Sequence, residues 1–267
     1  MKAASFAYAK PRALAEALDL AARPGAKILA GGQSLIPSLN MRLSSPELLV
    51  DINGLEELKG IHLDKDTVRI GALTTHAELA RSDVVKKHLP LLAAAVPHIA
   101  HPAIRNRGTL GGSLALADPA AEYPACTLAL DATIVVTGKK GSRKIKAGDF
   151  FKGLFETALK PGELLTAVEF KARKKDERSA FLELARRQGD YATIGLAAFA
   201  TNGTKRLASF GAGDRPILAQ YAAKAKDLDS AKAALAKDLQ PPADLYHSSA
   251  TKLHLARVLL ERAWNTL

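Results

Sequence analysis

The chain has 267 residues, of which 48% are hydrophobic and 24% charged, a composition typical of globular proteins that excludes a disordered chain. Its length allows one large domain or two to three lobes, because single cores stop growing at about 250 to 300 residues. The single cysteine, Cys126, excludes a disulfide framework, a cysteine-rich zinc site and an iron–sulfur cluster ligated by this chain.

No run of 18 apolar residues occurs, and the first 22 residues carry charge and proline where a signal peptide would be apolar. These features predict a cytoplasmic protein without a membrane span. The net charge of +11 is concentrated in residues 139–178, which hold twelve Lys or Arg against six Asp or Glu. Few aromatic residues are interleaved with them, so we interpret this stretch as a solvated basic face and not as a nucleic-acid surface.

The first 60 residues predict a helix, a strand, a short helix and a second strand. Pro11 opens a helical segment that residues 23–25 end. Residues 28–30 read as a short buried strand, followed by a Gly31-Gly32 turn and a short helix capped by Ser34. Residues 47–53 predict the next strand, and Asp51 and Asn53 mark its exit turn.

The middle of the chain predicts three strands around a long loop. We expect strands at 67–73, 133–137 and 163–172, with Thr74-Thr75 capping a helix after the first of them. Residues 83–100 are helical but interrupted by prolines, and residues 101–125 are rich in Gly, Pro and polar residues. A loop this long is uncommon unless it has a function.

The last 97 residues change in composition, and we place a domain boundary near residue 171. Residues 179–213 read as an antiparallel meander that turns at 188–190 and at 202–203. Two Ala/Lys-rich helices are expected within 216–238, and a last helix within 247–264.

Two similar glycine segments are the most informative feature of the sequence. The first runs from Ala30 through Gly31, Gly32 and Gln33 to Ser34, and the second from Thr109 through Leu110, Gly111 and Gly112 to Ser113. Adjacent glycines let backbone N–H groups approach an anion, and two such turns facing each other could hold both phosphates of a dinucleotide. Their spacing fits neither a Rossmann fingerprint nor a Walker loop.

These segments and several others, in the same order over nearly the whole chain, resemble the FAD-binding medium subunit of molybdenum hydroxylases, the carbon monoxide dehydrogenase and xanthine dehydrogenase family. The resemblance rests on six stretches of sequence: AGGQSLIPSLNMRL, TTHAEL, IRNRGTLGGSLALADPAAEYPACTLALDATI, PGELLTAVEF, RRQGDYATIGLAAF and YHSSATKLHLARVLLERA.

The resemblance implies an α+β chain with a two-lobed FAD-binding fold of the PCMH type. Its lobes would span about 1–56 and 57–170. Residues 171–267 would form the flavoprotein C-terminal domain, with a three-stranded antiparallel sheet and helices. No catalytic residue and no metal ligand are expected in this chain.

The same resemblance implies the residues that hold FAD. Both glycine segments would embrace the pyrophosphate, Glu122 falls at an acidic position near the FAD, and apolar residues line the adenine end. Residues 187–191 lie toward the isoalloxazine in relatives. The expected set is Ala30, Gly31, Gly32, Gln33, Ser34, Leu35, Thr109, Gly111, Gly112, Ser113, Glu122, Leu164, Leu165 and Tyr191.

Three positions depart from the family pattern. Gln33 stands where carbon monoxide dehydrogenases tend to have His, Ser113 where Asp or Asn is frequent, and Glu183 where Lys is common. The last change replaces a cation near the flavin with an anion, which bears on the flavin potential and on the electron acceptor. With Cys126 far from both segments and Gln33 in place of His, FAD is expected to be non-covalent. We also expect Gly111→Val to abolish flavin retention by placing bulk against phosphate.

The resemblance further implies the partners. Substrate hydroxylation would occur at a molybdenum cofactor on a large subunit, and electrons would cross [2Fe–2S] clusters on a small subunit to reach FAD. A dimer of heterotrimers is expected, without nucleic acid. The final acceptor would be NAD, a quinone or dioxygen.

Other residues that could carry chemistry have ordinary explanations. His98 and His101 have a metal-ligand spacing but no third ligand nearby in sequence, so we interpret them as loop histidines. His76 reads as a capping-turn residue and Cys126 as a small buried hydrophobe. Ser34 and Ser113 have no His nearby to activate them.

Two alternative functions stay open. The first is a stand-alone flavoenzyme of the same fold with its own organic substrate, for which Arg186 and Arg187 are the only adjacent arginine pair in the C-terminal region. The second is a basic nucleic-acid module, which predicts a colourless protein and steeply salt-dependent binding.

Overall fold

The computed structural model describes residues 2–267 and begins with a small lobe built on a parallel sheet. Its sheet has the order β1-β3-β2, with β3 parallel to both neighbours. The elements are β1 (Ala7–Ala9), α1 (Leu14–Ala21), β2 (Ala26–Leu29), α2 (Leu35–Asn40), β3 (Leu48–Asp51) and the 3₁₀ turn η1 (Glu56–Leu58). The predicted helix forms because Leu18 and its neighbours pack onto the sheet through buried Val50 and Ile52.

The second lobe contains a five-stranded antiparallel sheet with the order β4-β5-β10-β6-β7. Its strands are β4 (Ile61–Asp64), β5 (Thr67–Gly71), β6 (Thr133–Gly138), β7 (Gly141–Lys146) and β10 (Leu164–Lys171). Between β7 and β10 lie α9 (Ala147–Phe150) and the pair β8 (Phe151–Gly153) and β9 (Glu156–Thr157). The predicted strands at 67–73, 133–137 and 163–172 are confirmed.

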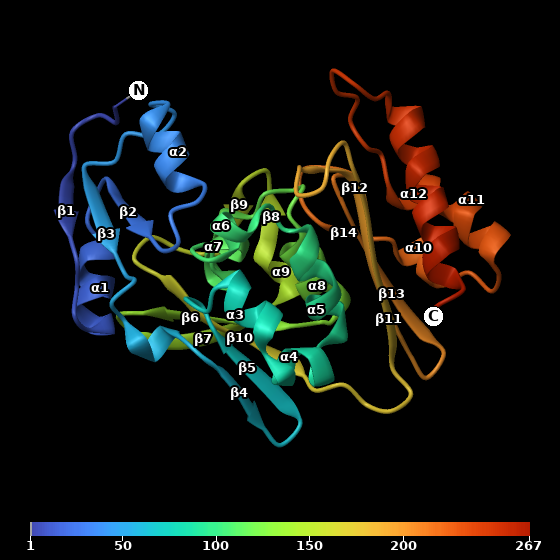
Figure 1. Ribbon diagram of the computed structural model, residues 1–267, viewed down its shortest axis with the longest axis horizontal. Helices are drawn as coiled ribbons and strands as arrows, with labels where there is room; N and C mark the ends of the chain where they lie inside the picture. The colour runs from blue at the N-terminus through green and yellow to red at the C-terminus, as the bar shows by residue number, and fades with distance from the viewer. Residues whose placement is uncertain (1) are drawn as a thin grey trace.

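Short helices connect β5 to β6 and fill the centre of the molecule (Figure 1). They are α3 (His76–Arg81), α4 (Asp83–His88), α5 (Pro90–Ala95), η2 (Val96–His98), α6 (Pro102–Arg105), α7 (Leu110–Leu116) and α8 (Glu122–Ala129). Thr75 caps α3 as predicted, because its Oγ1 accepts from Glu78 N while the Glu78 carboxylate accepts from Thr75 N.

The predicted long loop at residues 101–125 is wrong, because this stretch is largely helical. Thr109 Oγ1 accepts a hydrogen bond from Gly112 N and so caps α7. Every residue of α8 from Tyr123 to Ala129 is buried between neighbouring elements. Tertiary burial therefore overrides the low helix propensity of Gly and Pro here.

The C-terminal part is a sheet with helices packed on one face. Its strands follow the order β11-β12-β13-β14: β11 (Arg178–Ala185), β12 (Ala192–Thr201), β13 (Thr204–Phe210) and β14 (Ile217–Leu218). The meander and both of its turns are confirmed. The expected three strands are joined by a fourth, two-residue strand, which pairs with Ala208 and Ser209. The helices are α10 (Gln220–Ala223), α11 (Leu228–Asp238) and α12 (Ser249–Trp264).

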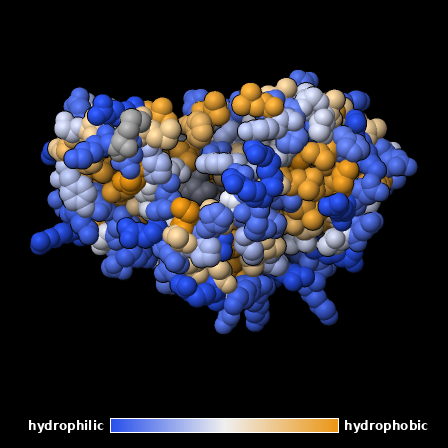
Figure 2. Space-filling view, turned by 45° about the horizontal axis from the view of Figure 1, so that its top comes forward, coloured by the Kyte–Doolittle hydropathy of each residue, from blue (hydrophilic) through white to orange (hydrophobic). Residues whose placement is uncertain are grey.

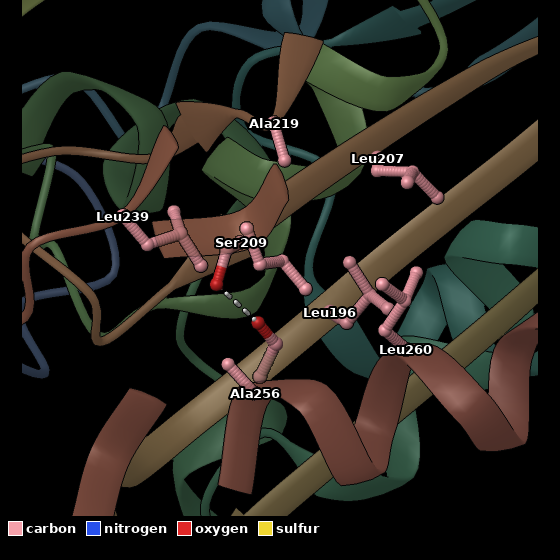
Figure 3. Close-up of a pocket in the computed structure, with 9 residues that line it drawn as sticks. Leu196, Leu207, Ser209, Ala219, Leu239, Ala256 and Leu260 are labelled. Carbon is pink, nitrogen blue, oxygen red and sulfur yellow. Dashed lines mark hydrogen bonds between the residues drawn. The ribbon is translucent and has the colours of Figure 1, made fainter. Parts of the chain in front are cut away.

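A cavity of about 10 Å³ lies between this sheet and its helices (Figure 3). Leucine and alanine side chains surround it, and Ser209 Oγ donates to the Gly195 carbonyl oxygen at 3.0 Å. A space of this size holds one water molecule at most. The helical face of the C-terminal sheet therefore offers no room for a cofactor.

The opposite face of the C-terminal sheet is buried in the central core of the molecule. Phe181 and Phe210 stack with ring centroids 5.6 Å apart, and both belong to the apolar cluster that also contains Val68, Leu91 and Leu128 of the second lobe. Figure 1 shows α5 and α8 lying between the two sheets. Among residues 2–267, no helix combines the length and apolarity needed to cross a membrane.

Candidate functional site

The first glycine segment is a turn that presents five consecutive backbone N–H groups without an acceptor inside the chain. Within residues 2–267, no hydrogen bond uses the N–H of Gly31, Gly32, Gln33, Ser34 or Leu35. Gly32 has a φ of +73°, a conformation that glycine adopts without strain. The Gln33 side-chain amide donates to the Gly31 carbonyl oxygen at 2.9 Å, which fixes the turn. Unpaired amides in a row form an anion-binding concavity.

A side chain from the end of β3 holds this turn in place. Asn53 Nδ2 donates to the Ala30 carbonyl oxygen at 2.8 Å and to Asp51 Oδ1 at 2.7 Å. The buried Asp51 carboxylate also accepts from Asn53 N and, at 2.5 Å, from the Tyr8 hydroxyl. Burial acts to raise the pKa of Asp51, but these donors outweigh it and lower the pKa below its ordinary value.

The two glycine segments lie against each other, as expected. A Cβ on Gly31 would overlap the carbonyl group of Arg107 and lie 2.8 Å from the Gly108 Cα. A Cβ on Gly112 would lie 3.9 Å from the Ala30 Cβ. Figure 2 shows the face of the molecule hollowed near its centre, between the first lobe and the remainder. Glycine at position 31 is therefore required by close backbone approach.

The second segment differs from the expected turn, because the amides of Leu110, Gly111, Gly112 and Ser113 are already used. Leu110 N donates to the Thr74 carbonyl oxygen, Gly111 N to that of Ala72, Gly112 N to Thr109 Oγ1 and Ser113 N to the Thr109 carbonyl oxygen. The first two of these bonds hold the start of α7 against the residues that follow β5. Of the two segments, the first therefore has the run of unpaired backbone N–H groups.

The expected effect of Gly111→Val has a different cause in the structure. A Cβ at position 111 would lie 2.6 Å from the Ala72 Cβ and 2.7 Å from the Ala72 carbonyl oxygen. The added bulk would therefore push α7 away from β5, not press on a phosphate.

Leu164 and Leu165 lie at the start of β10 and are buried. Leu164 packs in the core of the first lobe, whereas Leu165 packs in the central core. Next to them, the Thr166 carbonyl oxygen accepts from Ala72 N, whose own carbonyl accepts from Gly111 N. The strand that carries the two leucines is thus linked to the second glycine segment by two successive backbone hydrogen bonds through Ala72.

Glu122 and Tyr191 come together although 69 positions separate them. Glu122 is the first residue of α8; burial and then the charge of Asp118 raise its pKa to about 7. Tyr191 follows the β11–β12 turn, and the residue is 70% exposed. Partial burial, followed by the charges of Asp118 and Glu122, raises the pKa of Tyr191. The C-terminal sheet thus brings Tyr191 to the α7–α8 junction.

Glu183 is a buried carboxylate on the face of β11 that turns toward the second lobe. Its side chain is 2% exposed, and Oε2 has no hydrogen-bond partner among the described residues. The nearest basic side chain is His98, whose Nδ1 lies 3.8 Å from Oε2. Burial, and then the charge of Glu122, raise the pKa of Glu183 to about 8.

The remaining candidates have structural roles. His98 lies in η2 and His101 caps α6, and no group of three or more metal-ligating side chains occurs among residues 2–267. His76 opens α3 as expected and is buried against Tyr123, with ring centroids 5.3 Å apart. Cys126 is fully buried, and burial raises the pKa of its thiol well above the ordinary range, so the predicted hydrophobic role is confirmed.

Comparisons with known proteins agree with this geometry. The family model described as the FAD binding domain in molybdopterin dehydrogenase matches residues 4–170. The chain belongs to this family. It is 47% identical over 203 residues, 75% of this chain and 69% of the relative, to the 6-hydroxypseudooxynicotine dehydrogenase complex subunit alpha of Paenarthrobacter nicotinovorans. It is 41% identical to the carbon monoxide dehydrogenase medium chain of Hydrogenophaga pseudoflava, over 72% of this chain and 68% of that one.

Solved structures of family members have the same fold. Carbon monoxide dehydrogenase from Hydrogenophaga pseudoflava matches with a TM-score of 0.95 and 35% identity, covering 100% of this chain and 98% of that chain. Quinoline 2-oxidoreductase from Pseudomonas putida 86 matches with a TM-score of 0.92 and 36% identity over the same shares. The predicted family and α+β FAD-binding fold are confirmed, and the chain is an FAD-carrying oxidoreductase component.

The residues of this family member fit a flavin dinucleotide. Five unpaired amides suit a diphosphate, and the glycine contacts leave no room for side chains between the two segments. Sequence reasoning assigned Asp51 and Asn53 only to a turn and missed their support of Ala30. The sequence did contain a signal for this role. Asp51, an acceptor, and Asn53, a donor, stand one residue apart at the end of a strand.

Proposed function

We propose that this chain is the FAD-carrying electron-transfer subunit of a multi-subunit molybdenum hydroxylase. It would take electrons from the [2Fe–2S] clusters of a small partner subunit and pass them to an external acceptor. The observation that carries the proposal is the run of five unpaired amides at residues 31–35, held against the backbone of Arg107 and Gly108.

The chain's own residues would bind and orient the cofactor. The amides of residues 31–35 would donate to the diphosphate, and Asn53 would keep those amides aimed by holding the Ala30 carbonyl. Leu164 and Leu165 would exclude water at the adenine end, and Tyr191 would cover the ring system beside Glu122. When bound, FAD supplies the redox chemistry that no side chain here can perform.

The chain's composition supports the proposed distribution of cofactors among the subunits. A single buried cysteine cannot ligate an iron–sulfur cluster, so the clusters and the molybdenum cofactor would lie on partners. The names of two relatives, a dehydrogenase complex subunit and a medium chain, support a multi-subunit assembly. We infer a small [2Fe–2S] subunit, a large molybdopterin subunit, a dimer of heterotrimers and a cytoplasmic location. The boundary at residue 171 stays a prediction.

The test compares the chain alone with the chain expressed beside its neighbouring reading frames. Alone, it should be yellow, bind one FAD and be reduced by dithionite, yet turn over no organic substrate. With a cysteine-rich and a molybdopterin-type neighbour, it should elute as one complex in which substrate reduces the flavin. Turnover by the chain alone would favour the stand-alone flavoenzyme, and a colourless chain would reject both.

A further inference from the structure

Glu183 is the one buried carboxylate among the described residues whose oxygen has no hydrogen-bond partner. Along β11, Ala180, Leu182 and Leu184 face the C-terminal helices, whereas Phe181 and Glu183 face the second lobe. Phe181 takes part in the central apolar core, but Glu183 places a carboxyl group in the same layer. A charge there is costly unless it is paired or neutralised by a proton.

Two further groups adjoin Glu183 on opposite sides. His98 reaches it from η2 with Nδ1 3.8 Å from Oε2, and the His98 side chain is 34% exposed to solvent. On the α8 side, the charge of Glu122 acts on Glu183, and both carboxylates act on the thiol of Cys126, one turn after Glu122. His98 at the solvent, the buried Glu183 and then Glu122 therefore form a series. Its last member, Glu122, is the carboxylate whose charge acts on Tyr191.

We propose that His98, Glu183 and Glu122 form a proton path that joins solvent to the flavin and supplies the proton taken up on its reduction. This inference rests on the proposed function, because it places Glu122 beside the bound flavin.

Each transfer is balanced. Glu122 would give its proton to the bound flavin once the partner's [2Fe–2S] clusters have delivered two electrons to it, one at a time, and the electron pair of the broken O–H bond would stay on the carboxylate. Glu183 then reprotonates Glu122, and His98 passes a proton from water to Glu183. On reoxidation the proton returns along the same groups.

The protonation equilibria of the path suit this task. Burial, and then the charge of Glu122, raise the pKa of Glu183 to about 8, while burial, and then the charge of Asp118, raise that of Glu122 to about 7, so both carboxyl groups can hold a proton near neutral pH. Burial lowers the pKa of His98, so its imidazole is neutral there and can accept a proton. The other ionisable groups facing the pair are Cys126, Asp118, Tyr123 and Tyr191; α5 and β12 carry none.

The test uses the full chain with its bound flavin in an electrochemical infrared cell. The reduced-minus-oxidised spectrum should contain a difference band from the carbonyl of a protonated carboxylic acid near pH 7, because reduction of the adjoining flavin shifts its frequency, and the band should be lost in Glu183→Gln or Glu122→Gln. Proton uptake on reduction, followed with an indicator dye, should slow by about 100-fold in Glu183→Gln. Glu261→Gln, which removes an exposed carboxylate of α12 that pairs with Lys232 of α11, is the matched control and should change neither reading.

Each outcome decides the proposal. An unchanged band or an unchanged rate of proton uptake in Glu183→Gln overturns the path, while flavin binding by the same variant leaves the proposed function intact. A wild-type chain that retains no flavin rejects the proposed function itself. If Glu183→Gln loses flavin, His98→Gln decides: the path requires slower uptake with the carboxylic acid band preserved, and uptake at the wild-type rate overturns it.

Discussion

Asn53 Nδ2 donates to the Ala30 carbonyl oxygen at 2.8 Å, so a side chain at the end of β3 fixes the backbone that starts the anion-binding turn. The same amide nitrogen is held by Asp51 Oδ1, which ties the turn to the first parallel sheet. The unpaired N–H groups of residues 31–35 are thus pre-organised before any ligand arrives, which reduces the entropic cost of binding.

Asn53→Ala should weaken FAD binding by about tenfold, because it removes one hydrogen bond to the turn and leaves the Ala30 carbonyl oxygen without its partner. Fluorescence titration of the flavin-free chain with FAD measures the change. Asn265→Ala, at the end of α12, provides the control and should bind FAD as the wild type does. Equal affinity in both variants would contradict the role assigned to Asn53.

Gly31→Ala should destabilise the chain by about 1 to 3 kcal/mol and reduce flavin retention, because the new methyl group overlaps the Arg107 carbonyl. The lobes must then separate locally, which misplaces the amides. Gly148→Ala is a suitable control, since its methyl group would have only an ordinary contact at 4.0 Å with Leu128. Thermal unfolding and bound flavin per chain should distinguish the two variants.

The stability of the chain should fall as the pH rises from about 5 to 8.5. Glu183 and Glu122 have folded pKa values of about 8 and about 7, above the ordinary 4.5, so their contribution is full below 4.5 and is lost as the pH rises through 7 to 8. Glu183→Gln should remove much of this loss, on the order of 3 kcal/mol. Urea unfolding at pH 5 and pH 8.5 measures it, and an equally steep loss in the variant would argue against a buried, protonated Glu183.

His76 should stay neutral down to about pH 5, because burial and then the charge of Arg105 lower its pKa to about 4. Its contribution to stability is present above its ordinary pKa of 6.5 and is lost as the pH falls toward 4. Nitrogen NMR of the imidazole reports the protonation directly, and the same signal in urea should titrate near the ordinary value. Protonation of His76 near pH 6.5 in the folded chain would show that the ring is hydrated.

FAD should leave the chain on denaturation without covalent attachment. Cys126 is fully buried with a strongly raised thiol pKa, and Gln33 offers no nucleophile at the first turn. The mass of the denatured chain should equal that of the polypeptide, with all the flavin in the filtrate. A mass increased by one flavin would disprove this.

Local signals predicted the elements that have strong local causes. The capping pair of Thr75 and Glu78 and the Asn202-Gly203 turn depend on neighbours a few positions apart, and both were predictable. β1, β4 and β14 were missed because strands of two to four residues become visible only through their pairing partners.

The two glycine segments of the site were predicted from the sequence, but the different state of their backbone amides was not. Gly31-Gly32 and Gly111-Gly112 look alike in sequence, yet only the first pair keeps its amides unpaired, because Ala72 and Thr109 take those of the second. That difference depends on tertiary contacts with β5. The sequence did contain a signal for Glu183. Alternate residues of a strand point to the same face, so Glu183 lies on the same face of β11 as the apolar Phe181, and a carboxylate on that face indicates a buried charge.

The stacking of Phe181 on Phe210 inside the central core has a consequence for how this protein can be dissected. The match to the FAD-binding domain ends at residue 170. A fragment cut there would expose a broad apolar surface on α5 and α8 and would be prone to aggregate. The matched domain is therefore shorter than the unit that buries this core, and engineered fusions should carry both halves together.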